Sequence, residues 1–261
     1  MSASRWQQIG EGFWNLRGSF RVGGLVEIGT HLSLVRLQDQ RWAFLDAYSL
    51  DDEQIAAAEQ IAGGHDRIVA VLNLHPFHTV HVRAMHQAFP RAQLYGTERH
   101  RQRFADLPWA DECTEQSALH RRFAADLVFT VPRGVDFISA NEQVHFSSVL
   151  ALHRDSAAIH VDDTLMCLRM PLPLRWLGIR ELVSFHPSLG FALQKRAGAA
   201  AEFREWAEDL AEDWGHARHL CAAHNSGLSA AAAGPGGLRP LLQRALQKMN
   251  GTLKRHQRSW G

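Results

Sequence analysis

The chain has 261 residues, of which 46% are apolar and 21% are charged, and its formal net charge is +1 with histidine neutral. This composition is typical of a folded globular protein and excludes a disordered chain. Lys and Arg are spread along the sequence, so the charge pattern predicts neither a nucleic-acid partner nor a membrane-surface partner.

The cysteines and the N-terminal segment indicate a cytoplasmic protein. Cys113, Cys167 and Cys221 are an odd number at wide spacings, which predicts reduced thiols rather than a disulfide framework. The first residues contain no apolar secretion signal, and no uncharged apolar run reaches the roughly 18 residues of a membrane span. We therefore expect a cytoplasmic location.

The sequence of the N-terminal part of the chain predicts a group of strands, followed by a helix and a buried strand. Short strands are expected at residues 12–16, 25–28, 32–37 and 42–46, separated by turn signals. A helix is expected over residues 51–62, because Asp51 can cap its first turn and glycines follow its end. Residues 67–74 form an apolar, β-branched run that is typical of a strand buried on both faces.

The rest of the chain predicts alternating helices and strands and a closing helix. Further helices are expected at residues 78–89, 97–104, 199–214 and 238–256, and further strands at 93–95, 127–131, 144–152, 157–161 and 217–223. No internal repeat and no domain linker is visible, so the sequence predicts a single α/β domain over residues 1–261.

Histidines gather at the expected end of the buried strand. The sequence has 16 histidines, and the stretch Asn73-Leu-His-Pro-Phe-His78 lies where this strand meets the next helix. The ends of buried strands are where functional sites collect. His75 and His78 can point to one side, and neutral imidazole is the commonest protein ligand for transition metals.

Two other segments bring candidate ligands to the ends of strands. His153 ends the strand at 144–152, Asp162 and Asp163 end the strand at 157–161, and His224 follows the strand at 217–223. Side chains delivered by several strands of a rigid sheet are what a metal site requires. The other interpretation is that these histidines are hydrogen-bonded core or rim residues.

The order of these elements resembles that of the metallo-β-lactamase-fold proteins, in particular a divergent branch with a His-Arg-x-Ser stretch, here His153 to Ser156. The resemblance covers roughly residues 10–228. It implies a four-layer αββα sandwich, in which two mixed β-sheets are flanked by helices. It also implies that Asp46, at the end of an early strand, supports the metal loop from beneath.

The resemblance also implies a set of metal ligands. The family's H-x-H-x-D-H signature aligns with Asn73, His75, Phe77 and His78, so two of its four ligands are matched. The family's remaining ligands correspond to His153, Asp163 and His224, and Asp162 is the alternative to Asp163 as the bridging carboxylate. Asn73 offers only a weak amide oxygen, and Phe77 replaces an aspartate that binds metal and orients the attacking water.

These features predict a metal-dependent hydrolase that acts on a small ester, lactone, thioester or phosphoester. Zinc is expected as one or two ions, with iron or manganese as alternatives, bound by His75, His78, His153, Asp163 and His224. Asp163 is the carboxylate best placed to accept the proton of the attacking water. The competing hypothesis is an inactive binding or scaffold protein with a degenerate metal site, because the Phe77 ring removes a ligand. Iron redox chemistry is a third, minor alternative.

An apolar, proline-punctuated stretch lies between the last two candidate site elements. Residues 168–193 include Pro171, Pro173, Trp176 and Phe191. In this fold such an insertion lies near the mouth of the site, so it is predicted to form either a lid or a homodimer contact.

Overall fold

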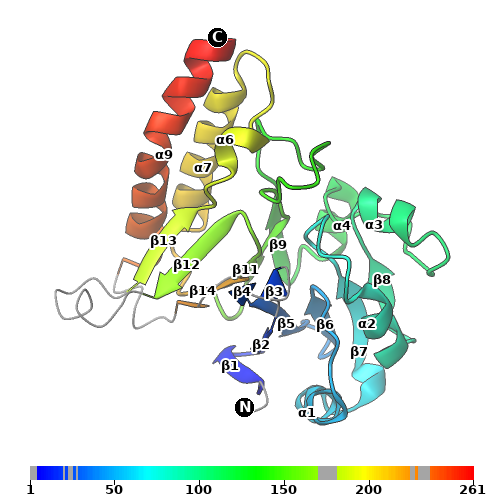
Figure 1. The fold of residues 1–261 in the computed structure, drawn as a ribbon. Coiled ribbons are helices and arrows are strands. Elements are labelled where there is room, and N and C mark those ends of the chain that lie inside the picture. Colours follow the sequence, from blue (N-terminus) through cyan, green and yellow to red (C-terminus); the bar gives the residue numbers. More distant parts are fainter. Residues whose placement is uncertain are drawn as a thin grey trace.

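The computed structural model describes residues 5–19, 21–22, 26–27, 29–169, 181–223, 227–228 and 236–261. Most strands form a six-stranded sheet with the order β1-β2-β5-β6-β7-β8 and a five-stranded sheet with the order β15-β14-β11-β10-β9. Figure 1 shows the two sheets facing each other. The predicted sheet pair is therefore present.

The first sheet is built mainly from the N-terminal third of the chain. Its strands are β1 (Gln7–Gly10), β2 (Phe13–Gly18), β5 (Thr30–Arg36), β6 (Trp42–Leu45), β7 (Ile68–Leu72) and β8 (Gln93–Tyr95). Strands β6, β7 and β8 run parallel, so their carboxyl ends lie at one edge. A short hairpin of β3 (Arg21–Val22) and β4 (Val26–Glu27) lies between β2 and β5 in sequence.

The second sheet is built from the central and C-terminal parts of the chain. Its strands are β9 (Leu127–Thr130), β10 (Leu150–His153), β11 (Ala158–Val161), β14 (His219–Ala222) and β15 (Gly227–Leu228). Strand β11 is antiparallel to β10 and parallel to β14. Strands β12 (Leu165–Arg169) and β13 (Glu181–Phe185) form an antiparallel pair beside it.

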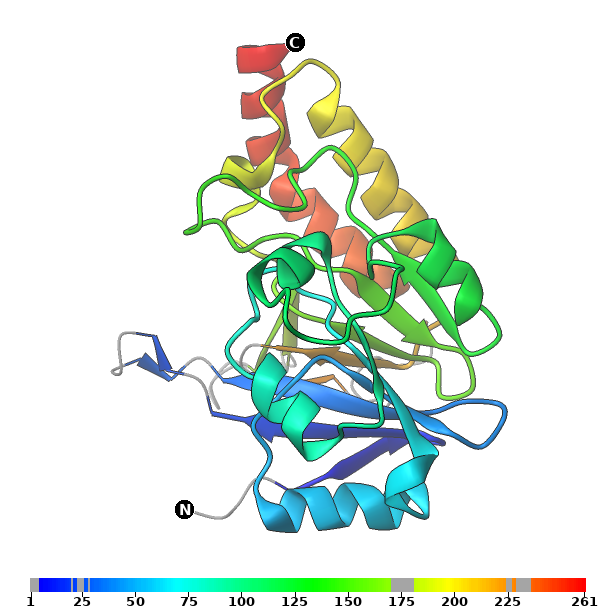
Figure 2. The ribbon, with the colours of Figure 1, turned by 90° about the vertical axis from the view of Figure 1, so that its right-hand side faces the viewer.

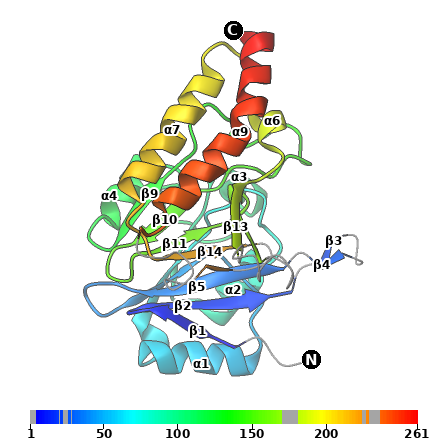
Figure 3. The same cartoon turned by 90° about the vertical axis from the view of Figure 1, so that its left-hand side faces the viewer.

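Helices cover the outer faces of both sheets. The helices are α1 (Asp52–Ala62), α2 (Val82–Ala88), α3 (Glu98–Arg103), α4 (Ser117–Arg122), α6 (Leu189–Ala192), α7 (Ala199–Asp213) and α9 (Arg239–Trp260), with a 3-10 turn η1 (His65–Arg67). Helix α1 lies under the first sheet, and α7 and α9 lie over the second sheet (Figures 2 and 3). The expected four-layer αββα sandwich is confirmed.

Three apolar cores separate the four layers. Strand β6 is buried on both faces. Its Trp42 and Phe44 side chains pack toward α1, whereas Ala43 and Leu45 pack toward the second sheet. Alternate side chains of a strand point to opposite faces, so an unbroken apolar run serves two cores at once. The third core lies between the second sheet and helices α7 and α9.

Several predicted boundaries shift in the structure. Helix α1 matches its prediction, with Asp51 accepting the Gln54 N–H in a capping box. Helix α2 begins at Val82 rather than at residue 78, because the residues after β7 form a loop that carries the site. Strand β10 begins at Leu150 rather than at 144, and β1 was not predicted at all.

The predicted lid or dimer segment falls partly outside the described residues, since Pro171, Pro173 and Trp176 belong to the undescribed range 170–180. Its described part is core: Val183 and Phe185 are buried against α7 and α9. Phe191 in α6 remains 78% exposed. Among the described helices, none combines the length and apolar character that a membrane span needs.

Candidate metal centre

The loop after β7 is fixed from below by Asp46. This residue directly follows β6 and adopts a left-handed conformation with φ 66°. Its Oδ1 accepts the backbone N–H of Leu74 at 2.7 Å, so it holds the start of the loop that carries His75 and His78. On the other side, the Leu74 carbonyl accepts the Val149 N–H at 2.9 Å. The loop is therefore attached to both sheets.

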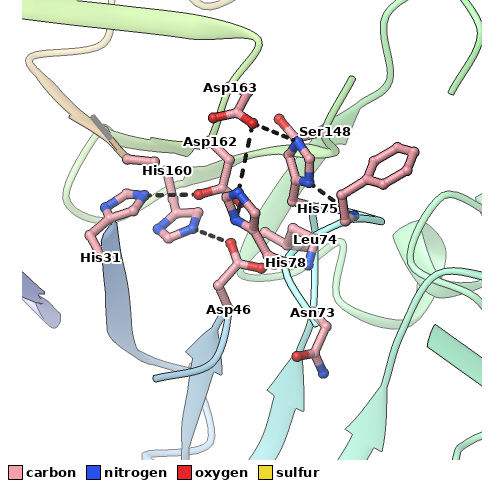
Figure 4. Close-up of polar contacts among 12 residues, drawn as sticks. His31, Asp46, Asn73, Leu74, His75, His78, Ser148, His160, Asp162 and Asp163 are labelled. Carbon is pink, nitrogen blue, oxygen red and sulfur yellow. Dashed lines mark hydrogen bonds and ion pairs between the residues drawn. The ribbon is translucent and has the colours of Figure 1, made fainter. Parts of the chain in front are cut away.

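An outer group of ligand atoms comes from this loop and from the end of β11. His75, His78 and Asp163 each offer one ligand atom, and these atoms lie within 4.8 Å of one another. Asp163 Oδ2 is 3.2 Å from His75 Nε2 and 3.7 Å from His78 Nε2. The two imidazoles stack with their ring centroids 4.0 Å apart. Figure 4 shows both rings turned toward Asp163.

An inner group lies deeper between the sheets. His31 on β5, His160 on β11 and Asp162 also place ligand atoms within 4.8 Å of one another. All three residues are at most 1% exposed. Asp162 lies between the groups: its Oδ1 is 3.4 Å from His31 Nε2, and its Oδ2 is 3.4 Å from His78 Nδ1.

The charges in these groups depend on one another. Burial lowers the pKa of His75, and the neighbouring His78 lowers it further. Burial also acts to lower the pKa of His78, but the carboxylates of Asp162 and Asp163 outweigh it and raise that pKa well above its usual value. Conversely, the His78 charge overcomes burial and lowers the pKa of Asp162 well below its usual range. Both shifts favour a charged, half-buried His78 beside an ionised Asp162 when no metal is bound.

Two departures from the family signature are visible in the geometry. The Asn73 side chain turns away from the site, because its Nδ2 donates to the Tyr95 carbonyl at 3.0 Å. The Phe77 ring stacks on His145 with a centroid distance of 4.7 Å, and the Arg99 guanidinium lies 4.5 Å from the Phe77 ring centre. Neither residue supplies a ligand to the outer group.

The structure does not bring His153, a predicted ligand, to the outer group. Its Nε2 donates to the Arg36 carbonyl at 2.9 Å, and its Nδ1 accepts from the Ser156 hydroxyl at 2.8 Å. Strand β10 runs antiparallel to β11, with His153 opposite Ala158, so the carboxyl end of β10 lies at the edge opposite Asp162. The error was to treat all strand ends as one edge, which holds only for parallel strands.

His153 should therefore affect stability and leave metal binding unchanged. We expect His153→Ala to lower the free energy of unfolding by about 2–3 kcal/mol, because it leaves the buried Arg36 carbonyl and Ser156 hydroxyl without this partner. Its metal content should equal that of the parent. Urea unfolding beside elemental analysis of the same samples checks both statements, and a loss of metal would restore His153 as a ligand.

The site end of β10 instead presents a serine. The Ser148 hydroxyl lies 3.0 Å from the Thr164 hydroxyl, beside Asp163 (Figure 4). The predicted ligand His224 lies outside the described residues. The structure thus brings together three of the five predicted ligands, His75, His78 and Asp163.

The sequence analysis missed the roles of His31 and His160. Both face the space between the sheets. His31 lies two residues before the inward-facing Ser33, and His160 lies two residues after the buried Ala158, so each shares the inward face of its strand. A histidine at an inward position of a buried strand was the available signal.

The comparisons with known proteins agree with this architecture. No protein-family model matches the sequence, and no curated protein matches it. Solved structures do match. A metallo-β-lactamase from Erythrobacter litoralis with β-mercaptoethanol in its active site has a TM-score of 0.60 and 13% identity, covering 94% of this chain and 98% of that one.

Two further structures give the same result. A metallo-β-lactamase from Pseudomonas aeruginosa in its mono-zinc form has a TM-score of 0.56 and 13% identity, covering 94% of this chain and 96% of that one. A metallo-β-lactamase from Hirschia baltica has a TM-score of 0.58 and 12% identity, covering 94% and 97%. With near-complete coverage and low identity, this chain is a divergent protein of the metallo-β-lactamase fold.

Proposed function

We propose that this protein is a metal-dependent hydrolase whose site is the outer group of His75, His78 and Asp163. The observation that carries the proposal is the convergence of three ligand atoms within 4.8 Å at the loop between β7 and α2 and at the end of β11. His75 Nε2 is buried and makes no hydrogen bond within the described residues, although Asp163 Oδ2 is 3.2 Å away. Such a nitrogen fits a metal ligand better than a core histidine.

The surviving residues fit one cation better than two. Asn73 and Phe77 do not contribute, which removes two of the four side chains in the family signature. Three protein ligands with an open position are the usual set of a catalytic zinc site. Of the solved structures that resemble this chain, one is in a mono-zinc form, and we propose zinc as the first ion to test.

Within this site each side chain has a distinct task. His78 faces Asp162 through Nδ1, which keeps its proton there, and loss of the Nε2 proton would free the Nε2 lone pair for an ion in the outer group. A bound divalent ion lowers the pKa of its water from 15.7 to about 7 and polarises the oxygen under attack. Asp163 holds its carboxylate beside both imidazoles and accepts the proton of the attacking water. The substrate class that we propose is a small ester, lactone, thioester or phosphoester.

Metal content and turnover test the proposal together. The protein, purified without a histidine tag, is loaded with zinc, manganese or iron, dialysed and analysed for bound metal. We expect about one ion per chain, and turnover on an esterase, lactonase, thioesterase and phosphodiesterase panel that a chelator abolishes and the ion restores. No bound metal after loading would overturn the metal site, and bound metal without turnover on the whole panel would overturn the hydrolase.

A second candidate, a metal-free binding protein, is favoured by one contact. The Phe77 backbone N–H donates to His75 Nδ1 at 3.1 Å, so the ring proton of neutral His75 resides on Nε2, opposite Asp163. Metal binding at Nε2 requires the other tautomer, in which Nδ1 carries the proton and the Phe77 peptide turns away. Under this alternative His75 and Asp163 form a polar pair in a degenerate site. Absence of metal from the loaded protein is the result that selects it.

A further inference from the structure

The inner group makes a reciprocal connection between the two sheets. His31 on β5 of the first sheet points to Asp162 at the end of β11 in the second sheet, with 3.4 Å between Nε2 and Oδ1. His160 on β11 of the second sheet points to Asp46 at the end of β6 in the first sheet, with 2.8 Å between Nε2 and Oδ2. Each sheet thus supplies a histidine to the carboxylate of the other (Figure 4).

The two imidazoles also pack against each other. Their ring centroids are 4.2 Å apart and the ring planes differ by 4°, so they stack face to face. Both rings are buried, and stacking of this kind adds to the burial of the ring surfaces. Because one ring belongs to each sheet, the stack fixes how the sheets lie relative to each other at this edge.

Hydrogen bonds behind the rings orient them toward the carboxylates. The Asn15 amide nitrogen lies 3.0 Å from His31 Nδ1 and also donates to the Leu32 carbonyl, so His31 Nδ1 accepts and Nε2 carries the proton. His160 Nε2 faces an Asp46 oxygen and donates to it, so Nδ1 accepts from the Ser33 hydroxyl at 2.9 Å. Both rings therefore direct an N–H at a carboxylate.

The hydrogen bonds of the inner group separate it from the outer group. Both nitrogens of His160 are engaged, Nδ1 by the Ser33 hydroxyl and Nε2 by the Asp46 carboxylate, whereas His75 Nε2 has no hydrogen bond within the described residues. An ion in the inner group would have to displace one of these His160 bonds to gain three protein ligands, and bound zinc usually has three or four. The inner histidines have a supporting position rather than a metal-binding one.

The carboxylates of Asp46 and Asp162 both contact the loop that carries the outer histidines. Asp46 binds the Leu74 N–H at the start of the His75 loop, and Asp162 faces His78 Nδ1 further along that loop. Asp162 also directly precedes Asp163, the outer carboxylate. Contacts through His31 and His160 therefore act on both sides of the outer group, beside the direct bond between the Leu74 carbonyl and the Val149 N–H.

We infer that the stacked pair of His31 and His160 positions the outer metal site, by fixing the loop after β7 relative to the end of β11. The inference deepens the proposed function and rests on it for its metal readouts. Neither histidine touches metal or substrate; both act through Asp162 and Asp46. Outer partners of metal ligands typically change metal affinity by 10–100-fold when they are removed.

Variants of His31 test this role, since the residue is remote from Asp163 in sequence and its ring nitrogens face Asn15 and Asp162. We expect His31→Leu to weaken zinc affinity by roughly 10–100-fold in a chelator competition and to shift the visible spectrum of the cobalt-loaded protein. His31→Gln keeps an N–H that can reach Asp162, and it should recover most of both effects. His153→Leu is the matched control, because it removes a buried imidazole at the opposite edge.

The outcomes separate positioning from stability. Zinc affinity that falls equally in His31→Leu and His153→Leu, or that His31→Gln fails to recover, would overturn the inference. If the parent binds no metal, the proposed function fails, and imidazole nitrogen NMR of the metal-free protein then decides the role of His31. We expect the His78 ring resonances to move in His31→Leu and to stay in place in His153→Leu; unchanged His78 resonances would refute the positioning.

Discussion

His75→Ala should abolish stoichiometric metal binding. His75 supplies one of three ligand atoms in the outer group, and within the described residues its buried Nε2 has no hydrogen bond to another partner. Losing a direct ligand should cost more than the 10–100-fold that follows from losing an outer partner, so we expect zinc affinity to fall by well over 100-fold. Elemental analysis after dialysis should show zinc near background, and turnover should fall in proportion to the bound metal.

The comparison with other variants shows whether the loss is specific. Asp163→Asn keeps the shape of the side chain but removes the charge, so we expect a similar loss of metal. His153→Ala should keep its zinc, because its imidazole lies at the opposite edge of the sandwich. Retention of a full zinc equivalent by His75→Ala would place the ion elsewhere and overturn the assignment of the outer group.

The fold was predictable where short apolar strands are bounded by clear turn and capping residues. The β7 segment is apolar on both faces, and Asp51 and the following glycines mark α1 at both ends. The loop between β7 and α2 was less predictable, since Pro76 and the histidines suit either a helix start or a loop. Hydrogen bonds from Leu74 to Asp46 and Val149 hold this segment as a loop, and these tertiary contacts cannot be read from the local sequence.

The candidate site was predictable only where sequence order and spatial order agree. His75, His78 and Asp163 follow strands whose carboxyl ends meet at one edge, so the linear argument placed them together correctly. His153 ends β10, which runs antiparallel to β11, and the local sequence does not predict the direction of a strand within its sheet. His31 and His160 reach the site from the middle of the sandwich, and only the pairing of sheets brings them to Asp162 and Asp46.

Asp46→Leu should strongly destabilise the protein. It leaves the Leu74 N–H and the His160 ring N–H without their acceptor, and each orphaned buried group costs about 1–3 kcal/mol. Leucine also suits the left-handed backbone at φ 66° poorly, which adds about 1–2 kcal/mol. We expect the free energy of unfolding, measured in urea at pH 6 on metal-free protein, to fall by at least about 3 kcal/mol, the sum of the lower limits of these contributions.

Asp46→Asn is the matched variant, and its effect should depend on pH. Burial, together with the charge of Asp162, raises the pKa of Asp46 to about 6, above its ordinary value of 3.8. Because the folded state holds the proton more tightly, the stability that Asp46 contributes is complete below pH 3.8 and is lost as the pH rises through 6. Asparagine keeps an acceptor for Leu74 and cannot ionise, while His160 can change tautomer to suit it. The unfolding free energy of D46N relative to the parent should therefore rise by about 2 kcal/mol between pH 4 and pH 7. A difference that stays constant over this range would mean that the Asp46 carboxyl ionises as readily in the folded protein as in the unfolded chain, and that His160 fully compensates its burial.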